Sequence, residues 1–120
     1  MATTVVLGAS PNPARVSYEA ILQLQRRGEH VVAIGRRAGQ IENVEIQQTA
    51  EPVADVDTVT LYLSAANQAG YEEYILEQLQ PKRLIFNPGA ENPRLMTAAR
   101  NQGIEAINAC TLVMMRVGAY

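Results

Sequence analysis

The sequence predicts a three-layer α/β domain, in which helices cover both faces of a doubly wound parallel sheet of about five strands. Short apolar runs rich in β-branched residues alternate with segments in which apolar residues recur at helical spacing. The runs are apolar at successive positions, which is typical of strands buried on both faces of a parallel sheet. Glycine, proline and asparagine separate these segments, as expected at turns.

The first part of the chain is expected to form two strands around a helix. Residues 3–7 and 30–34 are apolar and β-branched, so both are expected to be buried strands. Between them, apolar residues at helical spacing predict a helix over residues 17–27, which ends at Gly28. The following segment is irregular, with a short strand expected around residues 44–46.

The rest of the chain repeats the alternation. Three strands are expected, at residues 57–63, 83–86 and 104–107. Two helices are expected between them, at residues 67–79 and 93–101. Asn92 is the expected N-cap of the second helix, because Pro93 follows at the first helical position. The apolar run at residues 112–117, near the end of the chain, is expected to close the core or to form a dimer contact, and the core is favoured.

The composition is that of one globular domain spanning residues 1–120. Hydrophobic residues make up 48% of the chain and charged residues 18%, which disfavours a disordered segment. The net charge of -2 offers no general attraction to nucleic acid or acidic lipid. No apolar run approaches the ~20 residues of a membrane span, and no leader precedes the first strand. The single cysteine cannot form an internal disulfide, so a cytoplasmic location is expected.

The order of the elements indicates a Rossmann-like arrangement and places the candidate site. In open parallel sheets, ligands bind beyond the carboxyl ends of the strands, where the strand order reverses. Four segments of unusual composition follow expected strands, at residues 8–15, 35–39, 64–67 and 87–91. They are therefore the candidate ligand-binding loops.

The loop at residues 8–15, GASPNPAR, has the composition of an anion-binding turn. Gly8 allows a turn without a side chain in the way. Ser10 and Asn12 supply hydroxyl and amide donors, and Arg15 supplies a planar set of donors suited to phosphate. Backbone N–H groups at the start of the following helix also favour an anion. The alternative is an ordinary turn with a surface arginine, but its place after the first strand favours phosphate binding.

The loop at residues 35–39 carries two arginines where a dinucleotide-binding domain for NAD usually carries an acid. An acid would repel a phosphate on the ribose, whereas Arg36 or Arg37, next to Gly35, would attract it. This loop therefore disfavours NAD and favours a nucleotide with a phosphorylated ribose, either coenzyme A or NADP. The alternative is that both arginines are simply solvated.

The loops after the later strands are small and polar. Gly89 would let a ligand approach the backbone, and Asn87 would hydrogen-bond a polar linker such as the pantetheine amides. The alternative is that Asn87-Pro88-Gly89 is only a turn with a helix-capping role.

One stretch resembles a known family. The run VVLGASPNPARVSYEAILQLQRRGEHVVAIGRR contains a strand, a loop and a helix start that are similar to those of the CoA-binding domain proteins. These are small single domains that resemble the CoA-binding domain of the succinyl-CoA synthetase alpha subunit. The stretch FNPGAEN resembles a later glycine-containing turn of the same family. The residues that match the first loop and helix are Gly8, Ala9, Ser10, Pro11, Asn12, Pro13, Arg15, Ser17 and Tyr18.

The resemblance implies that coenzyme A lies along the carboxyl edge of the sheet. Gly8, Ser10, Asn12 and Arg15 would meet its phosphates, and Ser17 and Tyr18 would contact or support it. Arg36 or Arg37 would meet the adenosine end. The pantetheine arm would run toward Ser64 and Gly89.

The sequence assigns no catalytic residue and no metal ligand. The only histidine, His30, begins a strand at the amino end of the sheet, and Cys110 has no histidine partner to activate it. We therefore expect a module that binds coenzyme A or an acyl-CoA without assigned chemistry. One alternative is a small NADP-dependent oxidoreductase, although no Tyr-x-x-x-Lys arrangement supports it. Another is an interaction domain without a ligand.

Overall fold

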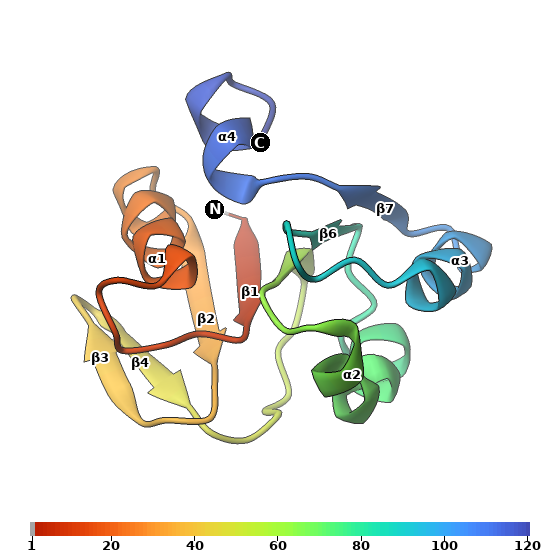
Figure 1. Cartoon of the computed structure of the whole chain (residues 1–120), viewed down its shortest axis with the longest axis horizontal. Coiled ribbons are helices and arrows are strands. Elements are labelled where there is room, and N and C mark those ends of the chain that lie inside the picture. The colour runs from red at the N-terminus through yellow and green to blue at the C-terminus, as the bar shows by residue number, and fades with distance from the viewer. Residues whose placement is uncertain (1) are drawn as a thin grey trace.

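One seven-stranded sheet runs through the part of the chain that the computed structural model describes, residues 2–120 (Figure 1). Residue 1 of the expected domain lies outside the described residues. The strand order is β3-β4-β2-β1-β5-β6-β7, and every neighbouring pair is parallel except β3 and β4. The strands are β1 Thr3–Leu7, β2 His30–Ile34, β3 Gly39–Ile41, β4 Val44–Gln47, β5 Val56–Leu61, β6 Arg83–Phe86 and β7 Glu105–Asn108.

Helices cover both faces of this sheet, as Figure 1 shows. One face packs on α1 and α4, and the other packs on α2, α3 and the turns that follow α2. The α-helices are α1 Val16–Arg26, α2 Ala65–Gln68, α3 Pro93–Asn101 and α4 Thr111–Arg116. A 3-10 turn at Ala69–Tyr71 and a π-helical segment at Tyr74–Leu79 continue the chain after α2.

Successive side chains of the central strands point to opposite faces of the sheet and pack into two separate hydrophobic cores. Val5 and Leu7 of β1 point into the core under α3, whereas Val6 points into the core under α1. All five residues of β1 are buried, as expected for a strand covered on both faces. Full burial of such a side chain contributes about 1.5–3 kcal/mol, so the two cores hold β1 at the centre of the sheet.

The α/β fold with helices on both faces of a mainly parallel sheet is confirmed, but the sheet has seven strands rather than about five. The additional strand β3 forms a hairpin with β4 and pairs Ile41 with Val44. It is only three residues long and contains Gly39, so neither its length nor its composition indicates a strand.

The expected helix over residues 67–79 is wrong as a continuous helix. It is divided into α2, the 3-10 turn at Ala69–Tyr71 and the π-helical segment. Gly70 lies in the middle of this division, where it weakens regular helical propagation. The bounds of α3 agree with the sequence, as does its N-cap Asn92, whose Oδ1 accepts a hydrogen bond from the amide of Leu95. The strand expected at residues 57–63 already ends at Leu61, and the strand expected at residues 104–107 is displaced by one residue.

The tail forms α4, which the sequence did not indicate as a helix. Met114 is buried, so α4 helps to close the core, while Val113 and Val117 are exposed. Tyr120 fixes the tail further, because its hydroxyl bonds the Thr4 hydroxyl and its carbonyl accepts a hydrogen bond from Arg83. Among the described residues, no helix has the length and apolar character needed to cross a membrane.

Candidate functional site

The carboxyl ends of the parallel strands meet at one edge of the sheet. Leu7 at the end of β1 lies beside Ile34 at the end of β2 and Leu61 at the end of β5. The strand order reverses here, since β2 lies on one side of β1 and β5 on the other. The loop at residues 8–15 leaves from this reversal point, which is where ligands bind in open parallel sheets.

The loop at residues 8–15 is held by its own side chains. The Ser10 hydroxyl oxygen accepts a hydrogen bond from the Asn12 amide at 3.1 Å, and Asn12 Oδ1 accepts one from the Ala14 amide at 3.0 Å. The Asn12 carbonyl accepts a third, from the Arg15 amide at 3.0 Å. The two side-chain oxygens thus accept hydrogen bonds inside the loop. The Ser10 hydroxyl hydrogen and the Asn12 Nδ2 group, in contrast, make no hydrogen bond to a described residue. The loop is therefore pre-formed and retains donors.

The start of α1 offers further donors. Arg15 is the N-cap residue, and no side chain of residues 2–120 caps this end of the helix. Among the described residues, no partner accepts a hydrogen bond from the amide of Val16 or Ser17. Free N–H groups at the first turn of an 11-residue helix, with the exposed Arg15 beside them, favour an anion. Ser17 itself is buried and Tyr18 packs against the core under α1, so both support the turn.

Two glycines place this loop against its neighbours. Gly8 has φ +96° and lies so close to the segment that leaves β5 that a Cβ would be 3.0 Å from the Tyr62 carbonyl carbon. Gly35 lies under the loop, where a Cβ would be 2.1 Å from the carbonyl oxygen of the buried Ala9. The loops after β1 and β2 therefore touch through main chain, and a side chain at residue 35 would push them apart.

The loop after β2 presents its arginines to solvent. Arg36 and Arg37 are both exposed, and neither forms an ion pair with a described residue. Their backbone is anchored to β4, because the Gly35 amide bonds the Gln47 carbonyl and Gln48 Nε2 bonds the Arg36 carbonyl at 2.9 Å. The guanidinium groups are therefore free to bind an anion while their loop stays fixed.

A cleft of about 520 Å³ lies beside this loop. It is lined by residues of the β3–β4 hairpin and of the segment that leaves β4, including Ala38, Gln47, Gln48 and Thr49. Gln48 connects the cleft to the arginine loop through its bond to Arg36. The cleft thus extends the carboxyl edge of the sheet on the β4 side.

The segments after β5 and β6 differ in their accessibility. Ser64 is exposed and is the N-cap residue of α2, and Pro88 and Gly89 are also exposed. Gly89 has φ +91°, and a Cβ there would meet no atom within 4 Å. Its amide is held by the Glu91 carboxylate at 3.0 Å. Gly89 therefore provides an open stretch of backbone that a ligand can approach.

Asn87 is placed differently from the other predicted residues. It is 1% exposed, and its Nδ2 donates to Thr60 Oγ1 at 2.7 Å and to the Leu61 carbonyl at 2.9 Å. Its Oδ1 accepts a hydrogen bond from the Thr111 amide at 2.8 Å. Both amide hydrogens are used internally, so Asn87 joins the end of β5 to the start of α4 rather than facing the site. A ligand contact by Asn87 would require these bonds to break.

Sequence reasoning missed two buried amides behind the site. Gln68 is 0% exposed and Asn92 is 6% exposed, and they bond each other at 2.9 Å. Gln68 lay in an expected amphipathic helix, where a glutamine is ordinarily solvated, and no spacing signal marked it. Asn92 was recognised only as a helix cap.

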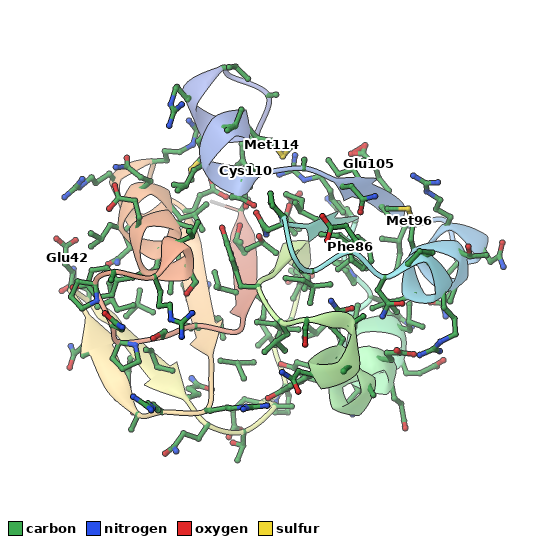
Figure 2. All side chains as sticks on the ribbon, in the orientation of Figure 1. Glu42, Phe86, Met96, Glu105, Cys110 and Met114 are labelled. Carbon is green, nitrogen blue, oxygen red and sulfur yellow. The ribbon has the colours of Figure 1, made fainter. Side chains whose placement is uncertain are left out.

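A half-buried tyrosine, Tyr62, lies under α4 near the same edge. Desolvation by burial raises the pKa of Tyr62 to about 12, although the nearby Thr111 and Thr60 hydroxyls lower it in part. The Tyr62 oxygen has no partner of hydrogen-bonding geometry among the described residues. Figure 2 shows Cys110 at the junction of β7 and α4. No group of three histidine, cysteine or acidic residues in the described chain could hold a metal ion.

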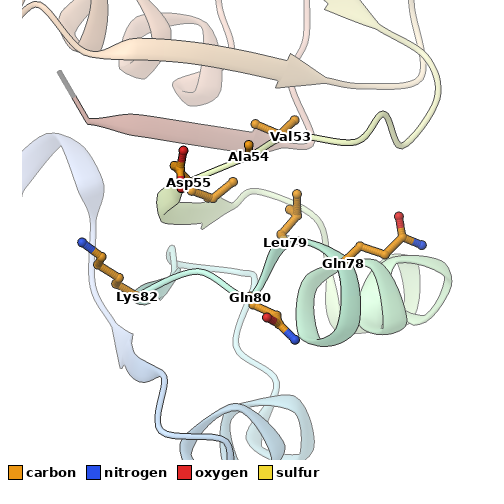
Figure 3. A pocket seen from close by; sticks show the side chains of 8 residues that line it. Val53, Ala54, Asp55, Gln78, Leu79, Gln80 and Lys82 are labelled. Carbon is orange, nitrogen blue, oxygen red and sulfur yellow. The ribbon is translucent and has the colours of Figure 1, made fainter.

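A second cleft lies at the opposite edge of the sheet. It has a volume of about 420 Å³ and is lined by residues at the start of β5, the end of the π-helical segment and Lys82. Figure 3 shows Leu79 pointing toward Val53 and Ala54 across this cleft. It faces the amino ends of β5 and β6, where a parallel sheet presents no helix N-terminus, so we do not assign it to the candidate site.

A known protein family and several solved structures match this chain over nearly its whole length. A sequence model described as a CoA binding domain matches residues 2–116. The crystal structure of an uncharacterised protein has a TM-score of 0.95 and 40% sequence identity, and the match covers 100% of this chain and 98% of that chain. Comparison with curated proteins found no match.

Two further solved structures share the fold at lower sequence identity. A hypothetical protein from Pyrococcus horikoshii OT3 has a TM-score of 0.82 and 19% identity, covering 94% of this chain and 81% of that chain. A protein from Thermus thermophilus has a TM-score of 0.81 and 18% identity, covering 99% of this chain and 90% of that chain. At these identities the likeness concerns the fold alone.

Proposed function

This chain belongs to the family of CoA-binding domain proteins, and from that premise we propose that it binds coenzyme A or an acyl-CoA along the carboxyl edge of its sheet. The observation that carries the proposal is the pre-formed loop at residues 8–15, at the reversal point of the sheet. Its free helix amides and the exposed Arg15 form an uncommitted set of anion donors. The diphosphate of coenzyme A is the group that would meet them.

The two ends of the ligand would lie on either side of this loop. Arg36 or Arg37 would bind the phosphate on the ribose, because both guanidinium groups are exposed and unpaired among the described residues. The pantetheine arm would run the other way, over Ser64 and the open backbone of Gly89. Asn87, Ser17 and Tyr18 would support these contacts from behind rather than make them.

The role that follows is that of a binding module. We assign no catalytic residue, because no nucleophile with an adjacent base occurs among the residues placed at this edge. The single histidine, His30, lies at the start of β2, beside Thr3, and is therefore at the amino end of the sheet. Delivery, storage or sensing of coenzyme A would all use the same contacts. A cytoplasmic location stays a prediction.

Calorimetric titration with coenzyme A, dephospho-coenzyme A, NADP and NAD tests the proposal. We expect coenzyme A to bind and dephospho-coenzyme A to bind about 10- to 100-fold more weakly, since one charge-assisted phosphate contact contributes roughly 1.5–3 kcal/mol. Removing both Arg36 and Arg37 should abolish that difference. Arg26→Ala is the matched control, because Arg26 is exposed at the far end of α1.

Two outcomes would contradict the proposal. Binding of NADP without coenzyme A would favour the NADP-dependent oxidoreductase that the arginine loop also permits. Absence of heat from all four ligands, with the protein folded, would favour an interaction domain without a ligand.

A further inference from the structure

One buried carboxamide links the two loops that would carry the pantetheine arm. Gln68 Nε2 donates to the carbonyl of Leu63 at 2.8 Å and to the carbonyl of Ala90 at 2.7 Å. Leu63 directly precedes Ser64, and Ala90 directly follows Gly89. Gln68 therefore holds the main chain next to both proposed contact points, although they belong to different strand ends.

The same carboxamide is fixed from its other side. Asn92 Nδ2 donates to Gln68 Oε1 at 2.9 Å, and Asn92 Oδ1 caps α3 through the Leu95 amide at 3.2 Å. Gln68 thus uses both of its amide hydrogens and its oxygen inside the protein. Because Gln68 is 0% exposed, no water competes for these bonds, and the rotamer of the side chain is determined by them.

The loops of the phosphate end do not depend on this arrangement. The segment at residues 8–15 is held by Ser10, by Asn12 and by main-chain contact with Gly35. No hydrogen bond joins Gln68 or Asn92 to that segment or to the arginine loop in the described chain. The edge of the sheet therefore consists of two parts with separate internal support.

We propose that Gln68 is a positioning residue for the pantetheine arm, and that it acts by setting the distance between the loops of Ser64 and Gly89. The proposal rests on the proposed function. A long flexible ligand gains affinity when the groups that receive it are already ordered, since less conformational entropy is lost on binding. Gln68 supplies that order for one half of the ligand and leaves the other half unaffected.

The variant Gln68→Met tests the binding of the pantetheine arm separately from the binding of the nucleotide end. Methionine has a similar length but no hydrogen-bonding amide, so the Leu63 and Ala90 carbonyls and the Asn92 amide lose their partner. Calorimetry would compare coenzyme A with adenosine 3′,5′-bisphosphate, which carries the nucleotide end alone. We expect affinity for coenzyme A to fall about tenfold or more and affinity for the bisphosphate to change less than about twofold.

Two further variants keep the result interpretable. Gln78→Met removes an exposed glutamine at the other edge of the sheet and should change neither affinity. Asn92→Ser keeps an oxygen that caps α3 but removes the amide group that donates to Gln68 Oε1, so we expect the same selective loss at a smaller size. Asn92→Ser also provides the test if Gln68→Met does not fold, which thermal unfolding would reveal.

The outcomes distinguish this proposal from the proposed function. If the wild-type protein does not bind coenzyme A, both are overturned. If it binds coenzyme A no better than the bisphosphate, or if a folded variant loses affinity for both ligands equally, coenzyme A binding stands and the positioning role is wrong. Unchanged coenzyme A affinity in Gln68→Met, or in Asn92→Ser where the former is unfolded, would also overturn the positioning role.

Discussion

Substitution of Gly35 by alanine would test whether the loops after β1 and β2 are packed as described. The new Cβ would lie 2.1 Å from the Ala9 carbonyl oxygen and 3.3 Å from Ile46 Cγ2. Ordinary contacts of this kind lie near 3.5 Å, so the loops would have to separate by about 1.4 Å. Overpacking of a well-packed site costs about 1–3 kcal/mol, and the obstacle here is main chain that cannot rotate away. We therefore expect a loss of about 3 kcal/mol.

Urea unfolding would measure the stability of this variant, and titration with coenzyme A would measure its binding. The Ala9 carbonyl lies within the loop at residues 8–15, so its displacement should also weaken binding about tenfold or more. Gly70→Ala is the matched control, because a Cβ there meets no atom within 4 Å. That control should be as stable as the wild type or more stable by up to about 1 kcal/mol. A Gly35→Ala protein with unchanged stability and affinity would refute the packing argument.

Three other substitutions have defined outcomes. Arg15→Ala should weaken coenzyme A binding by roughly 1.5–3 kcal/mol in calorimetry without changing the unfolding midpoint, whereas Arg26→Ala should change neither the affinity nor the midpoint. Asn87→Leu removes three buried hydrogen bonds and leaves the Thr111 amide without its partner, so it should lower stability by more than about 2 kcal/mol in urea unfolding, and a loss below about 1 kcal/mol would contradict the closed network. Tyr62→Phe should retain its stability at neutral pH, because the lost hydroxyl has no partner among the described residues. The folded pKa of Tyr62 is raised from 10.0 to about 12, so the unfolded chain ionises first and wild-type stability falls as the pH rises from about 10 to about 12. The variant should show a smaller fall in unfolding scans over that range.

The central part of the fold follows directly from local patterns. The bounds of β1, β2 and β6 agree with the apolar runs, and α1 differs from the expected helix by one residue at each end. These elements are long or continuously apolar, and glycines at Gly28 and Gly103 adopt φ +81° and +84° after their helices. Local chemistry alone determines such features, so one sequence suffices to recognise them.

The elements that the sequence did not indicate depend on partners distant along the chain. Strand β3 exists because Gly39 and Ile41 pair with β4, and its three residues carry no strand pattern of their own. The buried state of Gln68 depends on carbonyl groups of two other loops. A glutamine within a helical pattern has no local feature that distinguishes a buried network from a solvated surface.

The candidate site shows the same division. The loop at residues 8–15 was recognised from its own residues, and its internal hydrogen bonds are equally local. Asn87 was recognised as part of a site loop, but its side chain faces Thr60 and Thr111, which a sequence cannot bring together. Which of the exposed residues bind a ligand stays a prediction.

The two outermost strands limit how copies of this protein can associate. β3 at one edge has three residues, and β7 at the other has four, with Glu105 and Asn108 exposed. A short edge offers few free main-chain groups to an incoming strand, and at β7 the Glu105 carboxylate adds a charge. Edge-to-edge growth of the sheet, and the aggregation that follows from it, is therefore disfavoured at both ends. Self-association would instead have to use a helical face, such as the side of α4 that exposes Val113 and Val117.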